Sequence, residues 1–365
     1  MGDELSLDEI NERIDEFYEK SKQMEGKEVV ESEPWNTEVN ADQARHYLNG
    51  IGDINPRLDP AEPGNEVQPT YLTSVVYPML HGEPMEVPLS SLIAGMEYTW
   101  EEPIKVGDDL DGTAVVKDVF EKGDPEEKRY VFIISEVTYT RNGEHVATAE
   151  GTMIRATQRG TELLEERDPP EYTERDRSRF RSAYEDEIER LSGGPSSPDV
   201  QSLDVGDDLP TILRGPLNIA DMVCWNAGRG PTYGATVINY MERKNSPHNT
   251  VQNPHTGWMQ KTSHQHEDVW MCNQRGMPLP FANGVNMYAM SSPLVTNWMG
   301  SDGFLRSHEG NLKKPLYYGD VLWFGGEVTA IDDAGDDAAL SIEWTAENQE
   351  EELVLEGTST VELPK

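Results

Sequence analysis

The composition of the chain is dominated by acidic residues. Its 365 residues include 30 Lys and Arg against 68 Asp and Glu, which gives a formal net charge of -38. A folded protein with this charge repels itself unless concentrated salt screens the repulsion, so we expect it to come from a salt-loving archaeon. Nucleic acid is not an expected partner, because binding it requires a basic surface.

Length and cysteine usage narrow the class further. A chain of 365 residues is too long for one ordinary core, so two domains are expected. The two cysteines, Cys224 and Cys272, provide no disulfide framework and indicate a reducing compartment. No stretch is apolar enough to span a membrane, and the acidic start is unlike a signal peptide. These features predict a cytoplasmic protein with no membrane partner.

The N-terminal segment, residues 1–38, is predicted to contain a docking helix. Ser6 followed by Glu9 is typical of a capping box. Apolar residues then recur on one helical face, at Ile10, Ile14, Phe17 and Tyr18, until Gly26 ends the run.

The remainder of the chain contains an internal repeat. The segment VNADQARHYLNGIG at 39–52 returns as LNIADMVCWNAGRG at 217–230, which is 178 positions later. The segment PIKVGDDL at 103–110 returns as PLYYGDVL at 315–322, which is 212 positions later. Because the matches occur in the same order, we interpret them as a duplication.

Each half is predicted to end in three antiparallel strands. The strand-like segments cover 112–120, 129–140 and 144–155 in the first half, and 321–331, 338–346 and 352–363 in the second. Asn142-Gly143 predicts a tight hairpin between two of them. We therefore expect domains at 39–157 and 211–365.

Other segments differ between the halves. The repeat offset grows by about 34 residues (212 minus 178), which indicates an insertion at 233–261 that is typical of a lid or binding loop. A charged helical linker is expected at 158–210, with its helix over 171–191. One apolar central helix is predicted in each half, at 71–80 and at 285–299. This pattern predicts an α+β fold in which each sheet wraps round one helix.

Several short motifs carry a resemblance. The first half contains GDINPRLD at 52–59, and the second contains HED at 266–268, GMP at 276–278 and NG at 283–284. With these motifs the chain resembles the MaoC-like acyl dehydratases, which include the R-specific enoyl-CoA hydratases. The resemblance covers most of 39–364 apart from the insertion and the linker.

The resemblance implies a fused double hot-dog fold and a fatty-acid-type acyl-CoA substrate. It implies reversible addition of water to a 2-enoyl-CoA, with no cofactor beyond the CoA of the substrate itself. A homodimer of double hot-dogs is the expected assembly.

In the family, an Asp and a His activate the water, and a backbone amide at the helix start stabilises the thioester oxygen. The resemblance places His266 in the histidine position and Gly284, beside Asn283, in the amide position. The 18-residue spacing from His266 to Gly284 fits that assignment.

The catalytic acid does not follow the family pattern. Asp53 stands in the aspartate position of the first half, but Leu58 replaces its histidine. In the second half Lys261 occupies the expected aspartate position. The candidate acids are therefore Asp268 and Asp53. The structural alternatives are a turn-capping role for Asp53 and, for His266, the role of a structural histidine whose hydrogen bonds are satisfied within the fold.

Two further groups of residues have alternative interpretations. Arg306, Lys313 and Lys314 form a rare basic cluster, suited either to the phosphates of CoA or to local salt bridges. The HQHED segment at 264–268 resembles a metal-binding pattern, but the next residue is Val269 instead of the His that such a site requires. No metal is expected.

Two rival functions stay open on this fold. A thioesterase would need a carboxylate near the thioester carbonyl. A non-catalytic acyl-CoA-binding or partner subunit would explain why each half holds only part of the Asp-His pair.

Overall fold

The computed structural model describes residues 6–29, 34–61, 63–85, 89–157, 166–230, 236–245, 247 and 250–365. The described residues form one nine-stranded sheet in the order β2-β3-β4-β1-β8-β11-β10-β9-β5, and every pair of neighbours in it is antiparallel. Its strands are β1 (Leu89–Trp100), β2 (Leu110–Gly123), β3 (Arg129–Arg141), β4 (Glu144–Thr157), β5 (Asp208–Arg214), β8 (Phe304–Leu312), β9 (Leu322–Ala334), β10 (Asp337–Glu347) and β11 (Leu353–Pro364).

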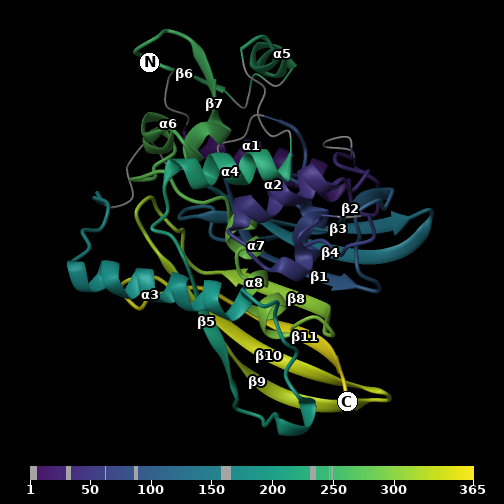
Figure 1. Cartoon of the computed structure of the whole chain (residues 1–365). Helices are drawn as coiled ribbons and strands as arrows, with labels where there is room; N and C mark the ends of the chain where they lie inside the picture. Colours follow the sequence, from purple (N-terminus) through teal and green to yellow (C-terminus); the bar gives the residue numbers. More distant parts are fainter. Residues whose placement is uncertain are drawn as a thin grey trace.

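The two halves of this sheet are related by an approximate two-fold axis. Strands β2, β3, β4 and β1 of the first half correspond to β9, β10, β11 and β8 of the second, and the halves meet where β1 pairs with β8. Glu97 lies directly opposite Glu309 at this junction, and the two positions differ by 212, the offset of the second repeat. Figure 1 shows the sheet running from the blue strands of the first half to the yellow strands of the second. The predicted duplication is thus visible as symmetry.

The six strands predicted from sequence are all present. Along β3 the buried positions alternate with less buried ones, so that Val131, Ile133 and Val137 face the core. The hairpin after β3 turns at Asn142 and Gly143, both with positive φ (55° and 83°), as the Asn-Gly pair predicts. Strands β1, β5 and β8 were not predicted.

The first repeat forms a pair of matching helices, α2 (Ala41–Ile51) and α4 (Ile219–Arg229). Each begins with an asparagine cap, at Asn40 and Asn218. They cross closely through equivalent glycines. A Cβ on Gly50 would lie 3.0 Å from the Cα of Trp225, and one on Gly228 would lie 2.4 Å from the carbonyl oxygen of His46.

The prediction of a central helix at 71–80 is wrong. The first half has only a 3₁₀ helix at Pro69–Ser74, followed by turns. Pro78 lacks an amide proton and disfavours helical geometry in the residue before it, so the apolar run cannot continue as an α-helix.

The central helix predicted at 285–299 is divided into α7 (Gly284–Ala289) and α8 (Ser292–Trp298). Pro293 cannot bond to the carbonyl of Ala289. The hydroxyl of Ser292 donates to that carbonyl instead (2.9 Å), and the hydroxyl of Ser291 donates to the carbonyl of Tyr288 (2.6 Å). The break is therefore stabilised by side chains.

Two helices pack outside these elements. Helix α1 (Leu7–Lys22) begins with the predicted Ser6–Glu9 capping box and buries Ile14 and Phe17. Helix α3 (Glu174–Leu191) falls in the predicted linker and packs beside β5 (Figure 1). Short 3₁₀ helices occur at Pro56–Leu58 and Val200–Ser202.

The described part of the expected insertion, 236–245, 247 and 250–261, contains α5 (Val237–Asn245) and a small hairpin of β6 (Thr250–Gln252) and β7 (Met259–Lys261). The other residues of 233–261 lie outside the described residues. A 3₁₀ helix at Thr262–His266 and α6 (Val269–Gln274) follow directly. No helix among the described residues is long and apolar enough to cross a membrane. The domain boundaries stay predictions.

Candidate active site

His266 is held in one orientation by a backbone carbonyl. It ends the 3₁₀ helix Thr262–His266, and its Nδ1 lies 2.8 Å from the carbonyl oxygen of Phe281. A carbonyl oxygen only accepts, so Nδ1 carries the proton and Nε2 presents its lone pair. Within the described residues Nε2 has no hydrogen-bond partner. The ring also packs edge-on against the ring of Phe281, with centroids 4.8 Å apart.

The surroundings of His266 keep its imidazole neutral. Burial lowers the pKa of His266 to about 4, and the positive charge of Arg229 acts in the same direction. The carbonyl of Phe281 opposes this shift of the pKa only in part. No carboxylate contributes to the pKa of His266 among the described residues. The ring is therefore a neutral acceptor at pH 7.

The segment that anchors His266 also begins helix α7. Asn283 caps this helix, because its Oδ1 accepts the amide proton of Val285 at 3.0 Å. The amide of Gly284 has no recorded partner among the described residues, as expected for the first turn of a helix. A Cβ on Gly284 would lie 2.8 Å from a Leu312 side-chain carbon and 2.9 Å from the Cβ of Ile93. Only glycine fits where α7 meets the β1–β8 junction.

Tyr77 and Arg229 complete this region, and the sequence did not single them out. The hydroxyl of Tyr77 donates to Oδ1 of Asn283 at 3.3 Å, and burial raises the pKa of Tyr77. The guanidinium carbon of Arg229 lies 4.4 Å from the centre of the Tyr77 ring. Tyr77 belongs to the first half and Arg229 to α4 of the second, so the site lies between halves. The sequence does offer one indication of Arg229: it stands at the repeat position that Ile51 occupies in the first copy, so a charged residue replaces an apolar one there.

Asp268 acts as a helix cap in the structure. Its Oδ1 accepts the amide proton of Met271 (2.9 Å) at the start of α6, and its Oδ2 accepts from the side chain of Gln260 (2.9 Å). Lys261, in the place of the expected aspartate, forms an ion pair with Glu242. No described contact joins the Asp268 carboxylate to His266.

Asp53 lies in a separate polar cluster. Its side chain is 5% exposed and accepts from the amide of Asn55 and from Nε2 of Gln68, both at 2.9 Å. Burial raises the pKa of Asp53, and Arg214 opposes that rise. No described contact or charge effect links Asp53 to His266, so the structure does not bring the two candidates together. The turn-capping interpretation of Asp53 fits this geometry.

The basic cluster is paired with carboxylates. Arg306 binds Glu362 at 2.9 Å, Lys313 binds Glu356 at 2.7 Å and Lys314 binds Glu352 at 2.5 Å. This arrangement matches the salt-bridge interpretation. A role in CoA binding stays a prediction for all three.

A cavity of about 440 Å³ lies beside the GDINP motif of the first half. It is bounded by the end of α2, by α3 and by the start of α4. Its charged lining residues are Asp221 and the buried pair of Arg214 and Glu187, whose two hydrogen bonds measure 2.9 and 3.0 Å. The charges of Arg214 and Glu187 thus neutralise each other. His266 does not line this cavity.

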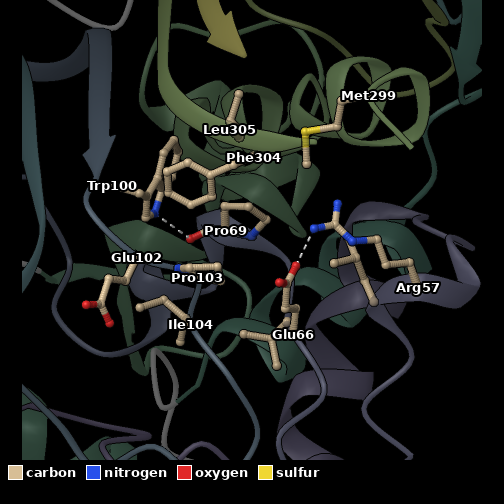
Figure 2. A pocket seen from close by; sticks show the side chains of 12 residues that line it. Arg57, Glu66, Pro69, Trp100, Glu102, Pro103, Ile104, Met299, Phe304 and Leu305 are labelled. Carbon is tan, nitrogen blue, oxygen red and sulfur yellow. Dashed lines mark hydrogen bonds and ion pairs between the residues drawn. The ribbon is translucent and has the colours of Figure 1, made fainter. Parts of the chain in front are cut away.

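Figure 2 shows a second, much smaller space at the contact between the halves. Its volume of about 20 Å³ is enough for one water molecule. The Arg57 guanidinium reaches across to Glu66 (2.5 Å) and to the carbonyl of Gly300 (2.8 Å), and Trp100 donates to the carbonyl of Pro69 (3.2 Å). We interpret it as a structural contact between the halves.

Comparisons with known proteins agree with the fold. Residues 26–149 match the family model described as "FAS1-like, dehydratase domain region". No curated protein matches the chain. Among solved structures, a "MaoC-like dehydratase" is similar with a TM-score of 0.64 and 16% identity, covering 93% of this chain and 99% of its own.

Two other solved structures are similar over comparable lengths. A conserved hypothetical protein from Mycobacterium tuberculosis, described as having a double hot-dog fold, has a TM-score of 0.57 and 10% identity, with 93% and 96% coverage. A putative MaoC domain protein dehydratase from Chloroflexus aurantiacus has a TM-score of 0.55 and 11% identity, with 93% and 95% coverage. The predicted double hot-dog fold is confirmed.

Proposed function

We propose that the protein is a hydro-lyase that adds water reversibly to a 2-enoyl-CoA thioester. The observation that carries this proposal is the neutral His266, anchored on the segment that leads into the Gly284 amide. The match of residues 26–149 to a dehydratase-region model and the MaoC-like fold support it. We place the activity in the cytoplasm of a salt-loving cell.

The proposed reaction uses His266 as a proton shuttle. Its Nε2 takes a proton from water while the water oxygen bonds to C3 of the enoyl group. The electrons of the C2–C3 double bond move toward the thioester oxygen, and the Gly284 N–H stabilises the resulting charge. The enolate then receives the proton from Nε2 on C2, and His266 becomes neutral again. One water is consumed, and no second acid is required.

The proposal assigns both proton transfers to His266, because the causes of its pKa shift are burial, the Phe281 carbonyl and Arg229. Once protonated, a histidine whose pKa is about 4 is a stronger acid than an ordinary imidazolium, so it returns its proton more readily to the enolate. Tyr77 and Asn283 hold the helix start in place through their shared hydrogen bond. Asp268 and Asp53 have structural roles in this proposal.

Hydration of crotonyl-CoA and longer enoyl-CoAs in molar KCl tests the proposal. His266→Ala is expected to lower kcat by roughly 10²-fold or more, because general base catalysis is lost. His145→Ala, on an exposed strand position, is the matched control and should keep wild-type turnover. Equal, negligible turnover of wild type and His266→Ala at every chain length would contradict the proposal.

The pH profile provides a separate check. Because burial lowers the pKa of His266 to about 4, the base is protonated only near that pH. The value of kcat/KM is expected to stay flat from neutral pH downward and to fall near pH 4. An inflection near pH 6.5, the ordinary value for histidine, would show that His266 is not the base.

A non-catalytic acyl-CoA-binding subunit is the second candidate. It is favoured by the same observation, the absence of a described acid next to His266. It predicts binding of enoyl-CoA without turnover in both wild type and His266→Ala. The thioesterase alternative requires a carboxylate at the thioester, and no described carboxylate contacts His266.

A further inference from the structure

The tract that leads up to His266 differs in charge from the rest of the chain. Residues 222–266 contain one acidic residue, Glu242, and four basic ones, Arg229, Arg243, Lys244 and Lys261, a formal charge of +3. The whole chain carries -38. The tract's own residues therefore repel an anionic ligand less than the rest of the chain does, an effect that is largest at low salt.

The same tract exposes an unusual number of apolar side chains. Half of the large hydrophobic residues that are exposed in the described structure lie in this tract, between positions 223 and 259. They are Val223, Val237, Ile238, Tyr240, Met241, Trp258 and Met259. Figure 1 shows α5, β6 and β7 at one end of the molecule, beyond α4 and α6 and away from the large sheet.

Two of these exposed residues, Tyr240 and Trp258, form an aromatic surface that packs against Arg243. The rings of Tyr240 and Trp258 stack with centroids 6.3 Å apart and planes 26° from parallel. The guanidinium carbon of Arg243 lies 4.8 Å from the Trp258 centroid and 5.5 Å from that of Tyr240. Arg243 is only 7% exposed, and its terminal nitrogen donates to the carbonyl of Met259 at 2.6 Å.

This arrangement fixes the two rings while leaving much of their surface open. Trp258 is 60% exposed and Tyr240 is 50% exposed. The buried Arg243 makes a cation–π contact with each ring, and its Nε has no hydrogen-bond partner among the described residues. Lys244, the next residue on α5, is exposed and forms no recorded ion pair within the described residues. Flat rings beside cations are suited to a base that carries phosphates.

The aromatic surface is connected to His266 by a short segment. Strand β7 ends at Lys261, and the 3₁₀ helix that contains His266 begins at the next residue. Trp258 precedes His266 by eight residues, so their Cα atoms are less than about 29 Å apart even for an extended chain. The connecting segment therefore limits how far this surface can lie from a thioester bound at His266.

We infer that Tyr240, Trp258, Arg243 and Lys244 bind the adenine nucleotide end of the CoA thioester. This inference rests on the proposed function for its substrate. The base stacks on the exposed rings, and the phosphates lie in the acid-poor surface beside Lys244. The insertion, which is present only in the second half, thus provides nucleotide recognition next to His266.

Calorimetric titration with adenosine 3′,5′-bisphosphate in molar KCl tests binding without turnover. Trp258→Ala is expected to weaken binding roughly tenfold, since a stacked base contributes about 1–3 kcal/mol. Trp258→Phe keeps a ring and should recover most of the affinity. Lys244→Glu should weaken nucleotide binding relative to wild type, and by a larger factor as salt is lowered. The exposed Lys27→Glu, the same charge change in the N-terminal segment, should leave binding unchanged.

Turnover separates this inference from the proposed function. The ratio of kcat/KM for crotonyl-CoA to that for crotonyl-pantetheine should fall about tenfold in Trp258→Ala. If wild type hydrates both thioesters and the variant changes neither this ratio nor nucleotide affinity, the inference fails and the function stands. If wild type binds the nucleotide through Trp258 but hydrates nothing, the function fails and the inference stands. A change of oligomeric state in Trp258→Ala, with unchanged nucleotide affinity, would show a subunit interface instead.

Discussion

His308 is a fully buried histidine with both ring nitrogens occupied. Nε2 lies 2.7 Å from the hydroxyl of Ser291, and Nδ1 lies 2.7 Å from that of Ser359. Its ring also stacks on Trp344 with centroids 5.1 Å apart. Burial lowers the pKa of His308 to about 3, so the folded protein holds this ring neutral.

This lowered pKa predicts loss of stability on acidification. The unfolded chain takes up a proton near pH 6.5, whereas folded His308 does not until about pH 3, so stability falls as pH drops below 6.5. From roughly pH 7.5 to roughly pH 5 the unfolding free energy should fall by about 2 kcal/mol through this residue. Chemical denaturation of His308→Gln should show a correspondingly smaller fall. His145→Gln is the exposed control, and an identical fall in all three proteins would refute the assignment.

Individual residues of the candidate site could be predicted from sequence only in part. The HED and NG motifs predicted His266 and Gly284 as candidates, because motif spacing survives within one continuous segment. Motif spacing could not predict which residues surround His266. Tyr77 comes from a distant turn and reaches the site only through folding. Asp268 was predicted as a candidate acid, but in the structure its carboxylate caps α6. The sequence did not predict this role, because it depends on where that helix begins.

At the scale of elements, the α2–α4 crossing depends on two glycines. Gly50 and Gly228 occupy equivalent repeat positions, and each meets the backbone of the opposite helix. Tyr47 and Trp225, also equivalent, pack beside the crossing with ring centroids 5.7 Å apart. The crossing therefore joins the halves on the helical side, as β1 and β8 join them in the sheet.

Gly228→Ala is expected to weaken this crossing. Its Cβ would lie 2.4 Å from the carbonyl oxygen of His46 and 3.0 Å from the Cα of Tyr47, so the helices must move apart. Overpacking of this kind costs about 1–3 kcal/mol. Thermal and denaturant unfolding should show that loss. Gly193→Ala, where a Cβ meets nothing within 4 Å, is the control, and equal stability of the two variants would argue against a close crossing.

Elements were predictable where the local pattern agreed with the fold. The strands of each half followed from alternation and from the repeat, and the Asn-Gly turn followed from its chemistry. The central helices failed because Pro78 and Pro293 outweigh the apolar periodicity. Strands β1 and β8 were missed because their pairing partners lie far along the chain.

At the scale of the whole molecule, carboxylates line one transverse row of the sheet. Each is a direct cross-strand neighbour of the next, with one threonine in the row: Glu136, Glu150, Glu97, Glu309, Thr358, Glu343, Glu327 and Asp208. Lys117 pairs with the first two. Like charges in direct opposition destabilise a sheet, so the row requires screening.

Glu97→Gln is therefore expected to stabilise the protein at low salt. Burial raises the pKa of Glu97, and the neighbouring charges of Glu309 and Glu150 raise it further, so its ionised form is unfavourable in the fold. The gain should be about 0.5 kcal/mol at low salt, because the side chain is partly exposed and screened. In molar KCl the Debye length falls to about 3 Å and the gain should largely disappear.

Unfolding midpoints measured across a KCl series will check this. Glu12→Gln, an exposed change on α1, removes the same charge away from the row. A gain in Glu97→Gln that is independent of salt, or matched by Glu12→Gln, would contradict the role of the row.

Because β1 and β8 belong to one chain, their pairing does not depend on protein concentration. If the two halves were separate chains, this pairing would be a second-order association, and lowering the protein concentration would release two open strand edges. In the fused chain both edges belong to one molecule, so the junction closes with the same equilibrium constant at any concentration. The linker therefore makes assembly of the two halves a unimolecular event.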